Sequence, residues 1–221
     1  STESGIITAV ESTVDVTNNT FFSNEYQYAA VEFMGGSNGV VAFNTFVGNF
    51  SELQNPNVRI SDLSEVALLG NIFVTQSDEL GVDEDADGTL IDQGGNFSTA
   101  DDAQYLSDDS SRTEVDEADL EIDAEPSNNG GYTDTFALGE TSIALNAVTA
   151  SDAEFALEYD LTTDQRGEPR GSLLDAGAWD DGIPAVSSLA STGVDATGIA
   201  LTGGLIGAAG AALVVRRRRK A

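Results

Sequence analysis

A short motif recurs along the first half of the chain at a nearly constant spacing. The tripeptide Asn-Thr-Phe stands at 19–21 and again at 44–46, an offset of 25 residues. Weaker copies, Asn-Ile-Phe at 71–73 and Asn-Phe-Ser at 96–98, follow at offsets of 27 and 25. Short runs of β-favouring residues lie between the copies, punctuated by Gly and Asn. Such a period, with about three strands per repeat, predicts solenoid coils over residues 1–100.

The repeated residues have physical roles in such a coil. Asn tolerates left-handed backbone angles at a tight corner, and stacked Asn amides can hydrogen-bond from one coil to the next. We expect Phe21, Phe46 and Phe73 to stack inside as a buried ladder. The pattern resembles the right-handed parallel β-helix of the pectate-lyase-like superfamily, which implies an all-β fold with about 25 residues per coil. The alternative is an antiparallel sandwich in which the copies are coincidental.

Charge is divided very unevenly along the chain. The sequence has 38 acidic and nine basic residues, and the last five basic ones are Arg216, Arg217, Arg218, Arg219 and Lys220. Residues 1–215 therefore hold four basic and 38 acidic residues, a net charge of −34. A body this acidic repels phosphate, which excludes a nucleic-acid-binding surface. The sequence has no Cys and no His, which excludes cysteine nucleophiles, zinc–thiolate sites and Ser-His-Asp triads.

The stretch at 198–215 is uncharged and mostly apolar. Its 18 residues would form a helix about 27 Å long, close to the ~30 Å hydrocarbon thickness of a bilayer. We expect a transmembrane helix there, with the basic tail at 216–221 on the cytoplasmic side. The alternative is a buried Gly- and Ala-rich core helix with a basic end.

A five-residue signal stands before this apolar stretch, and it consists of Leu189, Ala190, Ser191, Thr192 and Gly193. Signal, spacer, apolar span and basic terminus, in this order, resemble the cell-wall sorting signal of Gram-positive surface proteins. Ala190 in place of the usual Pro resembles the variant handled by class E sortases of actinobacteria. The resemblance implies cleavage between Thr192 and Gly193 and transfer to a peptidoglycan amine. The alternative is a membrane anchor that is never cut.

The regions that flank the sorting signal and the start of the chain carry two further expectations. Residues 181–188 contain Ser, Pro and small side chains, which predicts an extended linker between the folded body and the anchor. No charged and then apolar leader follows Ser1. We therefore expect the chain to be the C-terminal part of a longer precursor, or a processed form.

The stretch at 78–125 has 18 acidic residues and one basic residue, which predicts solvated loops. Asp83, Asp85 and Asp87 alternate before a glycine, as in the first half of a calcium loop. Gly94 occupies the position where a bidentate Glu is expected, so a bound ion would need another ligand such as Asp92. Calcium is the only cofactor that the sequence suggests, and the alternative is a solvated acidic turn.

Residues 101–180 contain a second recognisable block. Asn-Gly-Gly at 129–131 precedes an alternating stretch that predicts a strand, and Asp-Gln-Arg-Gly-Glu-Pro-Arg follows at 164–170. Leu-Asp-Ala-Gly-Ala-Trp then stands at 174–179. The combination resembles the choice-of-anchor Q type domain, which ends many bacterial surface β-helix proteins. Ala176 departs from the family pattern, which usually has Ile there.

The charged residues of this block are suited to a structural network. Asp164, Arg166 and Arg170 can form ion pairs that fix a loop over the open end of the solenoid, and we expect Trp179 to belong to this cap. In the alternative interpretation, the two Arg side chains bind acidic sugars and the Trp stacks on a carbohydrate.

These features together predict a non-catalytic, cell-wall-anchored surface protein that serves display, adhesion or glycan binding. Its expected partners are sortase, peptidoglycan, the membrane through 198–215 before cleavage, and an extracellular glycan or protein, but no nucleic acid. The alternative is an extracellular polysaccharide lyase or glycoside hydrolase on a β-helix scaffold. Arg59, with Asp62 nearby, is the only cation in the repeats that could serve it. Activity could equally reside upstream of Ser1.

Overall fold

The computed structural model describes residues 5–182 except 54, 77–78 and 86. The chain divides into two units, Ser1–Ala185 and Val186–Ala221, and all described residues belong to the first. The predicted sorting signal, apolar span and basic tail lie outside the described residues. Among the helices that are described, none has the length and hydropathy needed to cross a bilayer.

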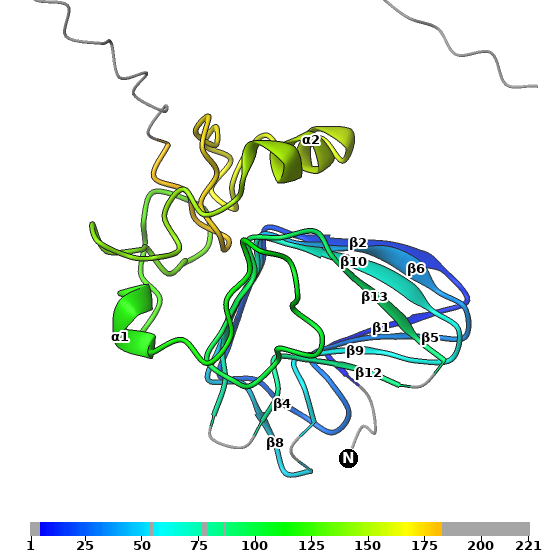
Figure 1. The fold of residues 1–221 in the computed structure, drawn as a ribbon. Helices are drawn as coiled ribbons and strands as arrows, with labels where there is room; N and C mark the ends of the chain where they lie inside the picture. Colours follow the sequence, from blue (N-terminus) through cyan, green and yellow to red (C-terminus); the bar gives the residue numbers. More distant parts are fainter. Residues whose placement is uncertain (1–4, 54, 77–78, 86, 183–221) are drawn as a thin grey trace, which may run out of the picture. The chain divides into compact units, whose positions relative to one another are not determined.

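The described residues form a parallel β-solenoid of about four turns with few helices (Figure 1). Sheet A consists of β1 (Ile7–Val10), β5 (Val31–Met34), β9 (Val58–Ile60) and β12 (Val82–Glu84). Sheet B consists of β2 (Thr13–Thr17), β6 (Asn38–Ala42), β10 (Glu65–Leu69) and β13 (Thr89–Asp92). Sheet C consists of β3 (Thr20–Phe22), β7 (Thr45–Val47), β11 (Ile72–Val74) and β14 (Phe97–Ser98). A smaller sheet D pairs β4 (Glu25–Tyr26) with β8 (Phe50–Ser51).

The strand register follows the sequence repeat. Thr20 lies opposite Thr45, and Phe46 lies opposite Phe73. Every strand pair among the described elements is parallel. Each coil thus gives one strand to each of the three main sheets. The predicted solenoid coil is confirmed, and the alternative of an antiparallel sandwich is wrong.

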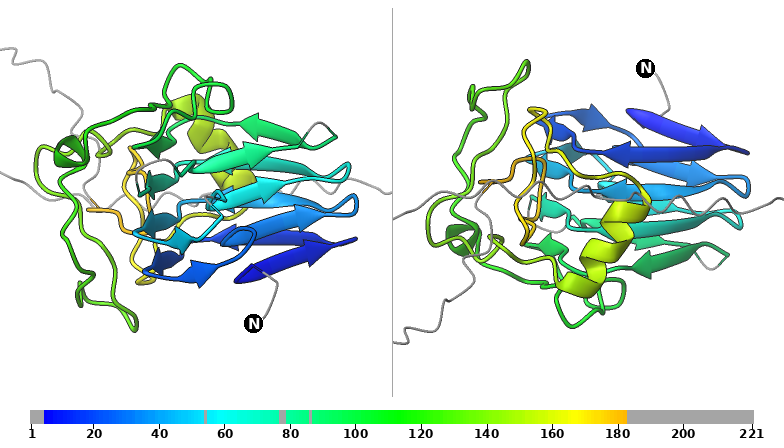
Figure 2. Two further views of the ribbon diagram at one scale, coloured as in Figure 1. Left: turned by 90° about the horizontal axis from the view of Figure 1, so that it is seen from below. Right: turned by 90° about the horizontal axis from the view of Figure 1, so that it is seen from above.

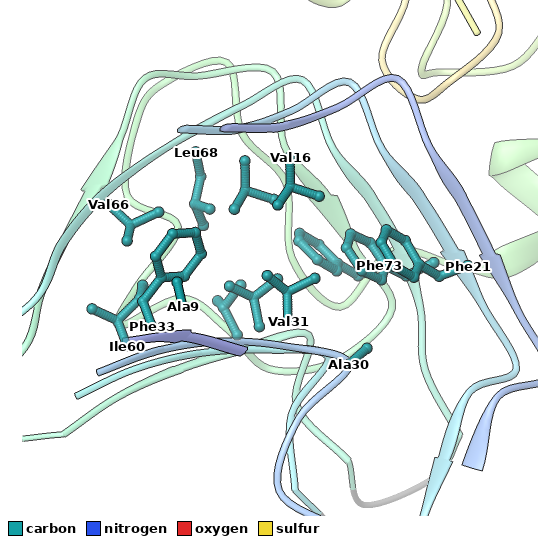
Figure 3. Packing of buried hydrophobic residues seen from close by; sticks show 14 of the residues in the cluster. Ala9, Val16, Phe21, Ala30, Val31, Phe33, Ile60, Val66, Leu68 and Phe73 are labelled. Carbon is teal, nitrogen blue, oxygen red and sulfur yellow. The ribbon is translucent and has the colours of Figure 1, made fainter. Parts of the chain in front are cut away.

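The core lies between the three sheets, where alternate side chains of each strand point inward (Figure 3). The rings of Phe21 and Phe46 stack with centroids 4.6 Å apart, and those of Phe46 and Phe73 stack at 5.0 Å. All three side chains are buried, which confirms the predicted Phe ladder. Val31 and Leu68, from sheets A and B, pack in the same cluster.

A ladder of asparagines runs along the corner between sheets B and C. The Asn44 side-chain oxygen accepts the Asn19 amide at 3.2 Å, and the Asn71 oxygen accepts the Asn44 amide at 3.0 Å. The Asn96 oxygen accepts the Asn71 amide at 2.9 Å. The predicted hydrogen bonding from coil to coil is therefore confirmed.

The left-handed residue at this corner is not the one that we expected. It is the residue before each ladder asparagine that has positive φ: Asn18 (56°), Phe43 (54°), Gly70 (60°) and Gly95 (64°). The ladder asparagines themselves are absent from the positive-φ positions of the described chain. The physical reason is that one left-handed residue turns the corner, which leaves the next side chain directed inward to bond its neighbours.

Residues 101–115 close the last coil. The backbone N–H of Arg112 donates to Asn96 at 2.8 Å, and that of Ser98 donates to the Arg112 carbonyl at 2.9 Å. Leu106 packs against the end of the solenoid core, and Asp102 is fully buried. This acidic stretch is therefore packed against the solenoid over these residues, because backbone hydrogen bonds to the last coil hold it there.

The chain then forms α1 (Glu117–Leu120), a series of turns, and α2 (Ala150–Glu158). The strand that we expected after 129–131 is reduced to isolated bridges, such as Ser127 with Thr135. Helix α2 lies outside sheet B and crosses its strands (Figure 2). Its Ala156 is buried in a cluster with Val40 and Leu69, which point outward from sheet B. This contact gives sheet B a partly covered outer face.

Candidate functional site

The four residues of the predicted capping network are brought together by the segment that follows α2. We call Asp164, Arg166, Arg170, Asp175, Trp179 and Asp180 the clasp network. Arg166 Nη2 lies 2.7 Å from Asp164 Oδ2, and its guanidinium lies 5.1 Å from the Trp179 ring centroid. Nη1 of Arg166 donates to the carbonyl of Asn129 at 3.1 Å. The loop at 164–170 is thus fixed to two other loops.

Arg170 joins the clasp network to the solenoid. Its Nη2 donates to the Asn18 side-chain oxygen at 2.8 Å and to the Gly177 carbonyl at 2.9 Å. Its Nη1 lies 3.4 Å from the Asp180 carboxylate, and its guanidinium stacks 4.0 Å from the Phe43 ring centroid. The side chain is only 1% exposed, which disfavours the alternative that it binds acidic sugars.

The segment that carries the clasp network lies beside the solenoid (Figure 2), whereas we expected the network over the open end. Ala178 donates its backbone N–H to the Thr45 hydroxyl at 2.9 Å, and Gly177 donates to the Gly70 carbonyl at 2.7 Å. With Asn18, these contacts reach three successive coils at the corner between sheets B and C. The end of the solenoid is already closed by residues 101–115, so the loop at 164–170 packs along the corner instead.

Phe43 is the apolar residue of the solenoid against which Arg170 of the clasp network packs. It is a left-handed residue and fully buried, and it belongs to the cluster outside the solenoid rather than to the inner core. A left-handed, bulky residue carries strain of about 1–3 kcal/mol, which the surrounding structure must offset. The contact with the Arg170 guanidinium and with Val148 supplies that offset.

Carboxylates outnumber cations in the clasp network. Among the described residues, Asp175, Asp180 and Asp181 form the one group of three acidic side chains that could share an ion, with ligand atoms within 4.8 Å. Backbone N–H groups already engage two of them: Asp175 accepts from Asn146 at 2.7 Å and from Asp181 at 2.8 Å, and Asp180 accepts from Gly171 at 2.9 Å. Burial raises the pKa of Asp175 to about 6 and lowers that of Arg170 to about 10. Arg170 therefore stays charged at neutral pH.

The buried carboxyls predict an unusual dependence of stability on pH. Burial raises the pKa of Glu32, Glu79, Asp102 and Asp175 above their ordinary values. Because the folded chain then binds these protons more readily than the unfolded chain, the free energy of unfolding should rise as pH falls from about 7 to about 5. For Asp175, the gain is complete below 3.8 and is lost as pH rises through about 6.

Urea unfolding measured across this pH range tests the prediction. Asp175→Asn should flatten the curve, whereas the same change at the exposed Asp134 should leave its shape unchanged. Glu121 acts in the opposite sense, because hydrogen bonds from Thr141 lower its pKa, so its contribution is lost only under more acidic conditions. A midpoint that falls steadily from pH 7 to pH 5 would contradict the prediction.

The predicted calcium ligands are not gathered into one group. Asp83 accepts the Tyr105 hydroxyl at 2.6 Å, and Asp85 pairs with Arg59 at 2.7 Å. Asp92 accepts backbone N–H groups, including that of Asp108 at 2.8 Å, and it binds the Asn96 amide at 2.7 Å. Asp87 contributes its carbonyl to the N–H of Leu63. The carboxylates of Asp83, Asp85 and Asp92 thus have separate partners within the protein.

A groove of about 500 Å³ lies on the outer face of sheet B. The strands supply Thr13, Asn38 and Glu65 to it, and α2 supplies Phe155 and Tyr159. We did not predict this groove from the sequence. The spacing of Phe155 and Tyr159, four residues apart, was the available signal, since it places both rings on one face of a helix.

Comparisons of the chain with protein-family models, curated proteins and solved structures returned no match. The fold and the clasp define a parallel β-solenoid with a C-terminal segment packed along its side. The resemblance to the choice-of-anchor Q type domain stays a prediction from the motifs, as does the resemblance to sortase signals.

Proposed function

We propose that the chain is a non-catalytic surface protein of a Gram-positive, actinobacterial-type cell, attached to peptidoglycan by sortase cleavage between Thr192 and Gly193. The observation that carries the proposal is the order of four parts at 189–221: pentapeptide, spacer, apolar stretch and basic terminus. In this proposal, residues 198–215 span the membrane before cleavage, and the basic tail stays in the cytoplasm. The mature protein then resides in the cell wall.

The fold supports a role in display. The described residues end at Gly182, two residues after Asp180 of the clasp network, and the pentapeptide begins at Leu189. A folded, acidic solenoid is thus followed by a short Ser- and Pro-containing stretch before the signal. We propose the right-handed form of the parallel β-helix, because crossovers between parallel strands are right-handed in nearly all proteins.

The surroundings of Arg59 support a structural role rather than catalysis. Its guanidinium lies 2.7 Å from Asp85 and 3.7 Å from Glu32, which is buried. Both carboxylates hold the guanidinium in ion pairs that join neighbouring coils, so the side chain is engaged within the fold. We therefore propose the display role ahead of a lyase or hydrolase.

Replacing Thr192 tests the anchoring. In a host with a class E sortase, the natural chain should remain in the wall fraction after extraction with hot detergent, and only a peptidoglycan hydrolase should release it. Thr192→Ala removes the residue whose carbonyl is transferred, so the variant should move entirely to the detergent-soluble membrane fraction. Ser191→Ala, at the variable position of the signal, is the control and should stay in the wall. A Thr192→Ala chain that remains covalently wall-linked would overturn the proposal.

A further inference from the structure

The groove on sheet B has a defined floor and two walls. Its floor is the outer face of β2, β6, β10 and β13, and α2 forms one wall by crossing these strands (Figure 2). The turns between sheets A and B form the other wall, where Gly36 and Leu63 stand. Because both walls cross the strands, the groove passes from one coil to the next. Such a shape fits a linear ligand.

The floor repeats a polar position once per coil. Thr13 lies opposite Asn38, and Asn38 lies opposite Glu65, and all three are exposed. Neighbouring strands are ~4.8 Å apart, a spacing close to the length of one sugar unit in an extended polysaccharide. A hydroxyl, an amide and a carboxylate in succession can accept or donate hydrogen bonds to sugar hydroxyls.

The wall formed by α2 presents aromatic rings. The ring centroids of Phe155 and Tyr159 lie 4.8 Å apart, and both residues line the groove. Tyr159 is 40% exposed, so its ring is accessible to a ligand. Exposed aromatic rings offer flat apolar surface to the C–H face of a sugar, while the Tyr hydroxyl stays available for hydrogen bonding.

The opposite wall has a strained residue at its rim. Leu63 has φ of 64° and is 78% exposed, and the preceding Asp62 also has positive φ. The preceding coil places Gly35 and Gly36, which adopt this conformation without steric penalty, at the corresponding turn. Burial does not explain an exposed leucine in a left-handed conformation, and such strain points to a surface that contacts a ligand.

Charge selects among linear ligands. Asp15 and Glu65 line the groove, and none of the residues that line it is basic. The body also has a strongly negative net charge, so polyuronates, teichoic-acid-like polymers and nucleic acids are repelled. A neutral polymer avoids this repulsion, and its hydroxyls can donate hydrogen bonds to the two carboxylates.

We propose that this groove binds a neutral linear polysaccharide, with successive sugars lying over successive coils. The biological meaning of this binding rests on the proposed surface location, which exposes the groove outside the cell. The binding itself is a property of the folded body and is measured separately from anchoring.

Native gel electrophoresis in gels that contain a polysaccharide tests the proposal. The probes are hydroxyethylcellulose, galactomannan and xylan as neutral polymers, with polygalacturonate as the anionic control. The full chain is kept in solution with a polyoxyethylene detergent, which carries no sugar. At least one neutral polymer should retard the chain, and polygalacturonate should not. Tyr159→Ala and Glu65→Ala should each weaken retardation about ten-fold.

Tyr132→Ala is the matched control, because Tyr132 is fully exposed and does not line the groove. It should leave retardation unchanged, and circular dichroism should show all variants folded. Retardation by none of the neutral polymers, equal retardation by polygalacturonate, or unchanged retardation of both groove variants would each overturn the proposal. A further gel contains polylysine instead of a polysaccharide. If only this gel retards the chain, the groove is a surface for cationic peptides and the proposal is overturned. If the chain is still attached to the cell wall but binds none of the neutral polysaccharides, the groove proposal is wrong and the anchoring proposal is unaffected.

Discussion

Arg170→Met should lower the free energy of unfolding by about 3–5 kcal/mol, because removing one partner of a buried ion pair leaves the other charge uncompensated. Asp180 is 1% exposed, and Arg170 is the cation that faces it in the clasp. The substitution also removes the donor to Asn18 and the cation over Phe43. Methionine has similar length and fills part of the space, so the loss reports mainly on charge and hydrogen bonding.

Urea unfolding followed by circular dichroism measures this loss, and limited proteolysis shows where it acts. Residues 161–182 should become sensitive to protease before the coils do. Arg112→Met is the matched control, because the Arg112 side chain is exposed and its guanidinium donates to the nearby carbonyls of Asp109 and Ser111. It should change stability by less than about 0.5 kcal/mol. Equal effects of the two substitutions would show that the clasp does not stabilise the fold.

Asn71→Ala should lower the free energy of unfolding by about 4 kcal/mol or more, since each buried polar group left without a partner costs about 1–3 kcal/mol. The Asn71 amide donates to the Val41 carbonyl at 2.7 Å, and its oxygen accepts the backbone N–H of Asn44 at 3.0 Å. The oxygen also accepts the Asn44 side-chain amide at 3.0 Å. Alanine fills none of these roles, and solvent does not reach the site.

The same substitution at an exposed position provides the control. Asn38 lies on the outer face of sheet B, where its oxygen accepts the Thr13 hydroxyl at 2.8 Å. Water replaces this bond, so Asn38→Ala should change the urea midpoint by an amount equivalent to less than about 0.5 kcal/mol. If Asn71→Ala were no more destabilising than Asn38→Ala, the ladder would not be a source of stability.

The solenoid could be predicted because each repeated residue meets its own copy in the next coil. Phe46 contacts Phe21 and Phe73, so a one-dimensional period in the sequence translates directly into a contact. The corner conformation could not be predicted in the same way. The left-handed position is filled by residues as different as Phe43 and Gly70, so no single residue type marks it.

The site was harder to predict than the coils. The motif at 164–170 indicated the right residues for the clasp network, but its place depends on contacts such as that between Arg170 and Asn18, 152 residues apart. No local pattern encodes such a separation. The groove requires α2, and although the spacing of Phe155 and Tyr159 places both rings on one face of this helix, it does not show which sheet the helix covers.

The contact between Arg170 and Asn18 determines how the body carries mechanical load. A force applied at Gly182 is transmitted to the first coil through Asn18, to the second through Thr45 and to the third through Gly70. These contacts resist together, as in shear, instead of letting the coils peel away one after another from the last. A load at this point is therefore shared among three coils rather than placed on the final coil alone.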